Sequence, residues 1–262
     1  MFIYPHINPV AFSLGPIKVH WYGIMYLLGF SFAWMLGNYR CQKLKLAWTS
    51  EQISDLIFYA AIGLILGGRI GYMLFYSWSE LIADPLKLFK VWEGGMSFHG
   101  GLLGGLIGLY LFGKHFQKPF LEVTDFTAPL IPLGLGAGRM GNFINGELWG
   151  RPSDLSWAMI FPHVDHLPRH PSQLYELGLE GIVLFFILFF YTLKPRPTGY
   201  ATALFFVLYS LFRFTIEFFR EPDIQIGFIF NHWLTMGQLL TIPVLLLGIL
   251  IWWYQKSYAK LS

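Results

Sequence analysis

Three charged side chains that suit chemistry interrupt long apolar stretches of this 262-residue sequence: Arg139, Arg213 and Glu217. A charge inside a membrane-crossing segment costs roughly 2.5–3.5 kcal/mol on insertion scales, so each calls for a partner or a function. Guanidinium groups stay charged at any physiological pH, and their forked N–H donors match the oxygens of a phosphate. Arg139 and Arg213 are therefore expected to bind a phosphate group, such as that of a phospholipid entering from the side.

His99 is the candidate base, and it lies between Gly94-Gly95 and Gly100-Gly101. A neutral imidazole can accept a proton from a thiol, because the reference pKa values of the two groups differ by only about two units. A phosphate clamp and a base are the minimum for alkyl transfer from a phospholipid to a thiol. Composition alone does not choose this reaction, and a histidine among glycines is often simply packed or hydrogen-bonded.

A denser group of polar residues follows Gly138. Arg139, Asn142 and Asn145 are spaced at three residues along the end of an expected helix, and Glu147 comes just after it. Glycines along the same segment permit close ligand approach and turns with positive φ; they are Gly138, Gly141, Gly146 and Gly150. This grouping favours a functional role over a purely structural one.

Structural alternatives exist for the other charges. Arg213 and Glu217 are four residues apart and can pair on one helix face, where Tyr209 lies one turn earlier. Arg69, a fourth charge inside an apolar stretch, is expected to serve helix packing as the ion partner of Glu93 or Glu122.

The elements that must position these residues are expected to be membrane helices. The chain is 55% hydrophobic and only 13% charged, whereas soluble domains carry about a quarter of their residues as charges. Its single cysteine, Cys41, excludes an internal disulfide framework and a cysteine-cluster metal site. We expect an all-α, polytopic membrane protein that forms a single integral-membrane domain over residues 1–262.

Seven apolar segments have spanning or near-spanning length. They are Val19–Tyr39, Leu56–Tyr76, Gly95–Phe112, Ala128–Ile144, Leu177–Leu193, Tyr200–Phe219 and Trp233–Tyr254. Glycines repeat every four residues in the second and third segments, at 63, 67 and 71 and at 100, 104 and 108. This spacing predicts close helix packing.

Basic residues in short loops set the orientation. The loops after the first, third, fifth and seventh segments hold nine Lys or Arg residues, which places the N-terminus outside and the C-terminus in the cytoplasm. The polar stretch 145–176, which contains four prolines and three tryptophan or phenylalanine side chains, is then a small external cap.

Several motifs resemble those of the prolipoprotein diacylglyceryl transferases, in the family's order and through nearly the whole chain. The most specific is Arg139-Met140-Gly141-Asn142-Phe143-Ile144-Asn145-Gly146-Glu147 with Gly150. The others are His20-Trp21-Tyr22-Gly23, Gly67-Gly68-Arg69-Ile70-Gly71-Tyr72, the segment 94–101, Arg169-His170-Pro171-Ser172-Gln173-Leu174-Tyr175-Glu176, and the segment from Arg213 through Arg220.

The resemblance implies a bacterial inner-membrane enzyme of seven spans. It would transfer the diacylglyceryl group of phosphatidylglycerol to the lipobox cysteine of a prolipoprotein, giving a thioether and glycerol phosphate without a cofactor or a nucleic-acid partner. The implied catalytic residues are His99, Arg139, Glu147 and Arg213. The implied substrate-binding residues, beside Arg139, are Tyr22, Asn142, Asn145, Gly150, Tyr209, Glu217 and Arg220.

A lipid or anion transporter is the alternative, with the arginines binding a headgroup in passage. It predicts paired broken helices and a path to both faces, whereas the polar residues concentrate toward one face and no strong internal repeat is evident. Zinc binding by His163, His166 and His170 is disfavoured, because the sequence has no His-Glu-x-x-His and no cysteine pair.

Overall fold

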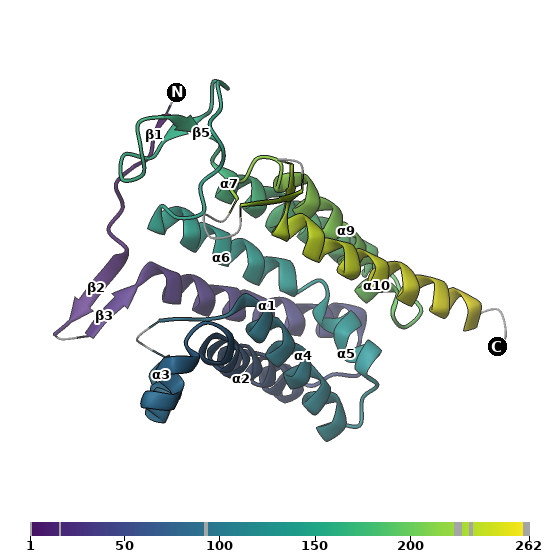
Figure 1. Ribbon diagram of the computed structural model, residues 1–262. Helices are drawn as coiled ribbons and strands as arrows, with labels where there is room; N and C mark the ends of the chain where they lie inside the picture. The colour runs from purple at the N-terminus through teal and green to yellow at the C-terminus, as the bar shows by residue number, and fades with distance from the viewer. Residues whose placement is uncertain (1, 16, 92–93, 223–226, 231–232, 259–262) are drawn as a thin grey trace. The chain divides into compact units, whose positions relative to one another are not determined.

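The computed structural model describes residues 2–15, 17–91, 94–222, 227–230 and 233–258 (Figure 1). Within this part the chain is mostly helical. It divides into two compact units: the first contains Met1–Leu36 and Asp125–Ser262, and the second contains Gly37–Thr124.

All seven predicted apolar segments coincide with helices, with ends shifted by a few residues. The helices are α1 (Trp21–Leu44), α2 (Ser50–Phe75), α4 (Phe98–His115), α6 (Ile131–Asn145), the continuous run of α7 (Ser172–Glu176), η3 (Leu177–Val183) and α8 (Leu184–Tyr191), α9 (Tyr200–Ile216) and α10 (Met236–Tyr258). Among the described residues, three helices are long and apolar enough to cross a membrane: Ser50–Phe75, Ser172–Tyr191 and Met236–Ser257. Shorter helices that the apolar pattern did not indicate are α3 (Trp78–Ala83), η1 (Pro85–Phe89) and α5 (Phe120–Thr127).

Helices α2 and α4 form the core of the second unit, and their glycines meet as the spacing predicted. A Cβ built on Gly104 would collide with the carbonyl oxygen of Gly63, and one on Gly100 would collide with that of Gly67. The two backbones are therefore in direct contact, and any larger side chain at these positions forces the helices apart.

Arg69 in α2 anchors the loop that leads into α4, and the expected pairing with Glu122 was wrong. Its guanidinium donates to the carbonyl oxygens of Leu88 (3.3 Å) and Gly95 (3.2 Å), and more closely to those of Lys87 and Gly94. Glu122 pairs instead with Lys118, and Glu93 lies outside the described residues. A guanidinium can satisfy several backbone acceptors at once, which a sequence pattern of opposite charges does not indicate.

In the first unit, α6 packs against η3, and α9 packs along α10 (Figure 1). Gly136 of α6 and Gly181 of η3 lie close enough that a Cβ on Gly181 would be 2.8 Å from the Cα of Gly136. Asp125 receives hydrogen bonds from the backbone N–H groups of Gly199 (2.5 Å) and Thr202 (2.8 Å), and so caps the start of α9.

Small sheets correct the expectation of an all-α chain. Strand β1 (Phe2–Ile3) pairs in parallel with β4 (Met159–Ile160), which pairs antiparallel with β5 (Pro168–Arg169). Two further hairpins join β2 (Val10–Leu14) to β3 (Ile17–His20) and β6 (Phe228–Phe230) to β7 (Leu234–Thr235). Such short strands lie outside the apolar spans, so hydropathy does not reveal them.

The segment 145–176 folds around an aromatic core of its own. Phe161 is fully buried, and the ring of Tyr4 stacks on it at 5.2 Å between centroids. At the edge, Arg169 pairs with Asp165 (2.6 Å) and Glu221 (3.0 Å), and its hydrogen bonds hold the pKa of Asp165 below the usual range. The segment is thus a packed structure rather than a linker.

Candidate functional site

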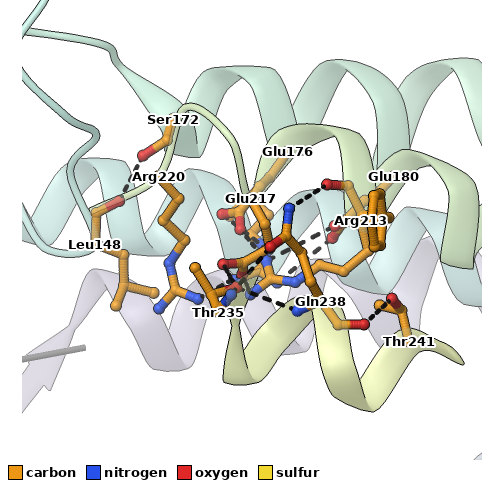
Figure 2. Close-up of polar contacts among 12 residues, drawn as sticks. Leu148, Ser172, Glu176, Glu180, Arg213, Glu217, Arg220, Thr235, Gln238 and Thr241 are labelled. Carbon is orange, nitrogen blue, oxygen red and sulfur yellow. Dashed lines mark hydrogen bonds and ion pairs between the residues drawn. The ribbon is translucent and has the colours of Figure 1, made fainter. Parts of the chain in front are cut away.

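Arg213, near the C-terminal end of α9, lies among three carboxylates (Figure 2). Its Nη1 contacts Glu176 closely and lies 3.8 Å from Glu180, and its Nη2 contacts Glu217 closely. Glu176 and Glu180 are fully buried, and Glu217 is 2% exposed. The pairing of Arg213 with Glu217 agrees with their four-residue spacing, but the sequence pattern did not indicate the other two partners.

Arg139, from the other side on α6, contacts the same two buried carboxylates. Its Nε lies 3.3 Å from Glu176 Oε2, and its Nη2 lies 3.4 Å from Glu180 Oε2. Glu176 and Glu180 therefore each bridge the two arginines, and the structure brings Arg139 and Arg213 together as predicted.

Glu217 joins this group to the start of α10. Its Oε1 receives a hydrogen bond from Arg220 Nη1 (3.1 Å), and its Oε2 receives one from Thr235 Oγ1 (2.9 Å). Thr235 and Gln238 also bond reciprocally, side chain to backbone, in the manner of a helix capping box (Figure 2). The cap of α10 therefore holds the carboxylate of Glu217, and this carboxylate in turn holds Arg213.

We call these six charged residues the Arg–Glu cluster: Arg139, Arg213, Arg220, Glu176, Glu180 and Glu217. Its formal charges cancel. The side chains of Arg139 and Arg213 keep 17% and 12% of their surface exposed, whereas those of Glu176 and Glu180 keep none. The surface that the cluster leaves exposed therefore belongs mainly to its arginines, and Glu176 and Glu180 are enclosed. Among the described residues, Arg139 Nη1 and Arg213 Nε donate no hydrogen bond, so their N–H groups remain available to a ligand.

Glu147 draws the end of α6 into a second polar group. Its Oε1 accepts from the side-chain amides of Asn142 (2.8 Å) and Asn145 (3.4 Å), and Gln173 Nε2 donates to its backbone carbonyl (2.5 Å). The turn is possible because Gly146, at the end of α6, has a φ of 67°. The structure thus brings together three residues that the motif predicted as site residues.

The two predicted tyrosines lie next to these groups. The ring of Tyr22 packs on Gly141, where an added Cβ would be 2.8 Å from it, and its hydroxyl lies 3.3 Å from that of Tyr26. Tyr209 stacks on Phe205 at 5.8 Å between ring centroids. Its hydroxyl is within electrostatic range of Arg139 and Arg213.

Gly150 joins the 145–176 segment to the end of α9. Its N–H donates to the carbonyl of His170 (2.8 Å), and a Cβ at this position would be 2.5 Å from the carbonyl oxygen of Phe219. Arg151 follows, donating to the carbonyls of Glu217 (3.1 Å) and Arg220 (2.9 Å). The structure therefore shows a packing reason for this glycine, beside the predicted substrate role.

His99 lies in the first turn of α4, in the second unit, and its side chain is exposed. Ser97 precedes it as the N-cap: its side chain accepts from the N–H of Gly100 (3.2 Å), and its own N–H donates to the carbonyl of Gly68 (2.9 Å). The position of His99 is thus fixed within its unit, and its role as a base stays a prediction.

Sequence reasoning did not single out Glu176, Glu180, Gln173 or the Thr235–Gln238 cap. Glu180 is a carboxylate inside the predicted span Leu177–Leu193, so the rule that singled out Arg139 should have singled it out too. The T-x-x-Q pattern from Thr235 to Gln238 is the sequence signature of a capping box. Glu176 and Gln173 carried no signal beyond their place in the motif that begins at Arg169.

Comparisons with known proteins cover almost the whole chain. A family model described as prolipoprotein diacylglyceryl transferase matches residues 9–254. The phosphatidylglycerol–prolipoprotein diacylglyceryl transferase of Legionella pneumophila (strain Lens) is 61% identical over 256 residues, which are 98% of this chain and 100% of the relative. The protein of the same name from Coxiella burnetii (strain RSA 331 / Henzerling II) is 57% identical over 254 residues, 97% of each chain.

Proposed function

The chain belongs to the prolipoprotein diacylglyceryl transferase family, and we propose that it transfers the diacylglyceryl group of phosphatidylglycerol to a prolipoprotein. The observation that carries this proposal is the 61% identity to a transferase of that name, end to end with the relative. The Arg–Glu cluster supports it, because guanidinium donors within the helices suit a lipid phosphate, and charges at such positions are costly unless they serve a function.

The reaction is a single displacement. The thiol sulfur of the lipobox cysteine forms a bond to the glycerol carbon that carries the phosphate, and the carbon–oxygen bond to phosphate breaks. Glycerol phosphate leaves with the bonding electrons, and the thiol proton passes to His99. Negative charge grows on the departing phosphate oxygens, so Arg139 and Arg213 stabilise the transition state more than the bound donor.

The arginines reach the phosphate from the exposed side of the cluster. Arg139 Nη1 and Arg213 Nε are free of described partners and supply N–H donors there. Glu176 and Glu217 hold Arg213 from behind through close contacts, so the guanidinium keeps its orientation without a substrate. Preorganised donors of this kind stabilise developing charge at little cost in reorganisation.

The other site residues that the family resemblance implies surround the phospholipid. Glu147, Asn142 and Asn145 present a joined set of polar atoms for headgroup hydroxyls, and a buried Asn145 Oδ1 without a described partner adds an acceptor. Tyr22 and Tyr209 supply hydroxyls. Glu217 and Arg220 orient Arg213, and Gly150 lets the chain pass close to Phe219.

The membrane arrangement belongs to the same proposal. The chain forms one integral-membrane domain of seven spans in the bacterial inner membrane. Its N-terminus and the 145–176 segment face the periplasm, and its C-terminus faces the cytoplasm. Support comes from the seven helices at the apolar segments and from the loop distribution of Lys and Arg.

A transfer assay tests the function. The purified full chain is incubated with phosphatidylglycerol carrying labelled acyl chains and with a peptide containing a lipobox cysteine. We expect a labelled thioether on the peptide and release of glycerol phosphate, and no product from a peptide with serine in place of that cysteine. If lipid moved between leaflets and no thioether formed, the result would support a transporter and contradict the proposed transfer.

A further inference from the structure

Glu180 is the carboxylate of the Arg–Glu cluster that no motif of the sequence includes. It lies on η3, where the helix Ser172–Tyr191 widens to π-helical geometry, a local distortion often found at functional sites. Gly181 and Gly136 let this turn approach α6, so that the carboxylate reaches Arg139. The chain thus uses a special backbone geometry to bury one more charge.

Glu180 is not what holds Arg213 in place, and it shares Arg139 with Glu176. Its oxygens lie 3.4 Å from Arg139 and 3.8 Å from Arg213, whereas Glu176 and Glu217 contact Arg213 closely. Its Oε1 is buried without a hydrogen-bond partner among the described residues. A buried carboxylate with such loose contacts is weak evidence of stabilisation, since a well-packed apolar side chain often serves stability as well or better.

What Glu180 contributes when it is ionised is a negative charge facing both arginines. The charged or titratable groups around it are Arg139 from α6, Arg213 and Tyr209 from α9, and Glu176 from its own helix. Without Glu180 the cluster would hold three arginines against two carboxylates, and its exposed guanidinium side would attract anions more strongly.

Stronger attraction for anions would slow product release, because the reaction increases the negative charge of the phosphate group. The donor is a phosphodiester with one negative charge, and the released glycerol phosphate is a phosphomonoester with a second ionisable oxygen, whose pKa is near 6. A strongly positive site therefore binds the product more tightly than the donor. Tight binding of donor or product gives no gain in turnover, because only the transition state need be bound well.

We propose that Glu180 is a charge-balancing residue: from behind Arg139 and Arg213 it weakens the binding of phosphate groups, so that glycerol phosphate leaves after each transfer. This inference rests on the proposed function, and it adds a role for a residue that contacts the arginines rather than the substrate.

The test is product inhibition in Glu180→Gln, a neutral side chain of the same shape. We expect the inhibition constant of glycerol phosphate to fall about ten-fold, and the KM for phosphatidylglycerol to fall by a smaller factor, because the product carries more charge. The matched control is Glu122→Gln, which removes an exposed carboxylate paired with Lys118 and should change neither constant. Glu176→Gln, by contrast, loosens Arg213 and should raise the KM.

A binding measurement separates this inference from the proposed function. Glycerol phosphate should raise the thermal unfolding midpoint of Glu180→Gln more than that of the unaltered protein, whether or not transfer occurs, and glycerol should raise neither. Failure of the unaltered protein to form a thioether would reject the function. Equal inhibition constants and equal thermal shifts in the two proteins would reject the role of Glu180.

Glu180→Asp covers the case in which Glu180→Gln does not fold. Its carboxylate is withdrawn by one methylene from the arginines, so the inhibition constant of glycerol phosphate should fall by about two- to three-fold. A constant equal to or higher than that of the unaltered protein would overturn the proposal.

Discussion

At the scale of single residues, the site depends on guanidiniums that carboxylates hold from behind. Arg213 is fixed by Glu176 and Glu217, and Arg139 shares Glu176 with it. The planar fork of arginine can bond a carboxylate with some N–H groups and present others to a ligand. A lysine ammonium at the same place keeps the charge but has no fork.

Arg139→Lys should therefore lower kcat/KM for thioether formation about 100-fold, the usual cost of removing one donor to a developing negative charge. The measurement is the initial rate with labelled phosphatidylglycerol and a lipobox peptide. Arg196→Lys is the control, since Arg196 is exposed and donates to the carbonyl of Tyr191. A rate within about three-fold of the unaltered protein would show that the fork of Arg139 is dispensable.

At the scale of elements, the glycine contact between α2 and α4 determines how the second unit packs. Gly63, Gly67, Gly100 and Gly104 allow backbone to touch backbone. No hydrophobic effect drives helices together within lipid, so close van der Waals contact is the main attraction there. This packing also places the loop that Arg69 anchors and the first turn of α4, which carries His99.

Gly104→Ala should destabilise the second unit by about 1–3 kcal/mol, because the added methyl group would overlap the carbonyl oxygen of Gly63. Gly105→Ala is a close control: the adjacent Cβ would meet no atom within 4 Å, so its unfolding midpoint should stay the same or rise slightly. Thermal unfolding in detergent micelles measures both. Equal midpoints for the two variants would contradict the close packing of α2 on α4.

At the scale of the whole molecule, the main expectation is seven spans with the N-terminus outside. The apolar segments and the helices agree in place, and three helices in the described part are long and apolar enough to cross a membrane. Short, glycine-rich helices such as α6 cross membranes only where protein neighbours surround them. The proposed orientation rests on the basic residues in the loops.

Cysteine labelling tests this orientation, and the chain suits it because Cys41 is its single cysteine. In a Cys41→Ser background, Asp154→Cys should react with a membrane-impermeant maleimide in intact spheroplasts. Lys194→Cys should react only after permeabilisation. Both positions are exposed, so accessibility within the fold does not limit either one. The reverse pattern would contradict the proposed topology.

Much of the site was predictable from the sequence, and there are physical reasons why some of its residues and contacts were overlooked. Arg139, Asn142 and Glu147 follow one another closely in the chain, so local spacing places them together. Glu180 was overlooked although it lies inside an apolar span, where a lone carboxylate is as costly as a lone arginine. Among the described residues, Arg69 donates to backbone carbonyls, and no pattern of side-chain types indicates those.

The sequence by itself determined the helices, the membrane class and the family, because apolar runs and contiguous motifs are local properties of the chain. Only the tertiary structure decided which carboxylates face which arginines. Glu176 and Glu180 lie about 40 residues from Arg139 in the chain, and they meet it because glycines let η3 pack on α6. Ion pairs in a membrane interior depend on distances across helices, and those distances are set by packing rather than by spacing along the chain.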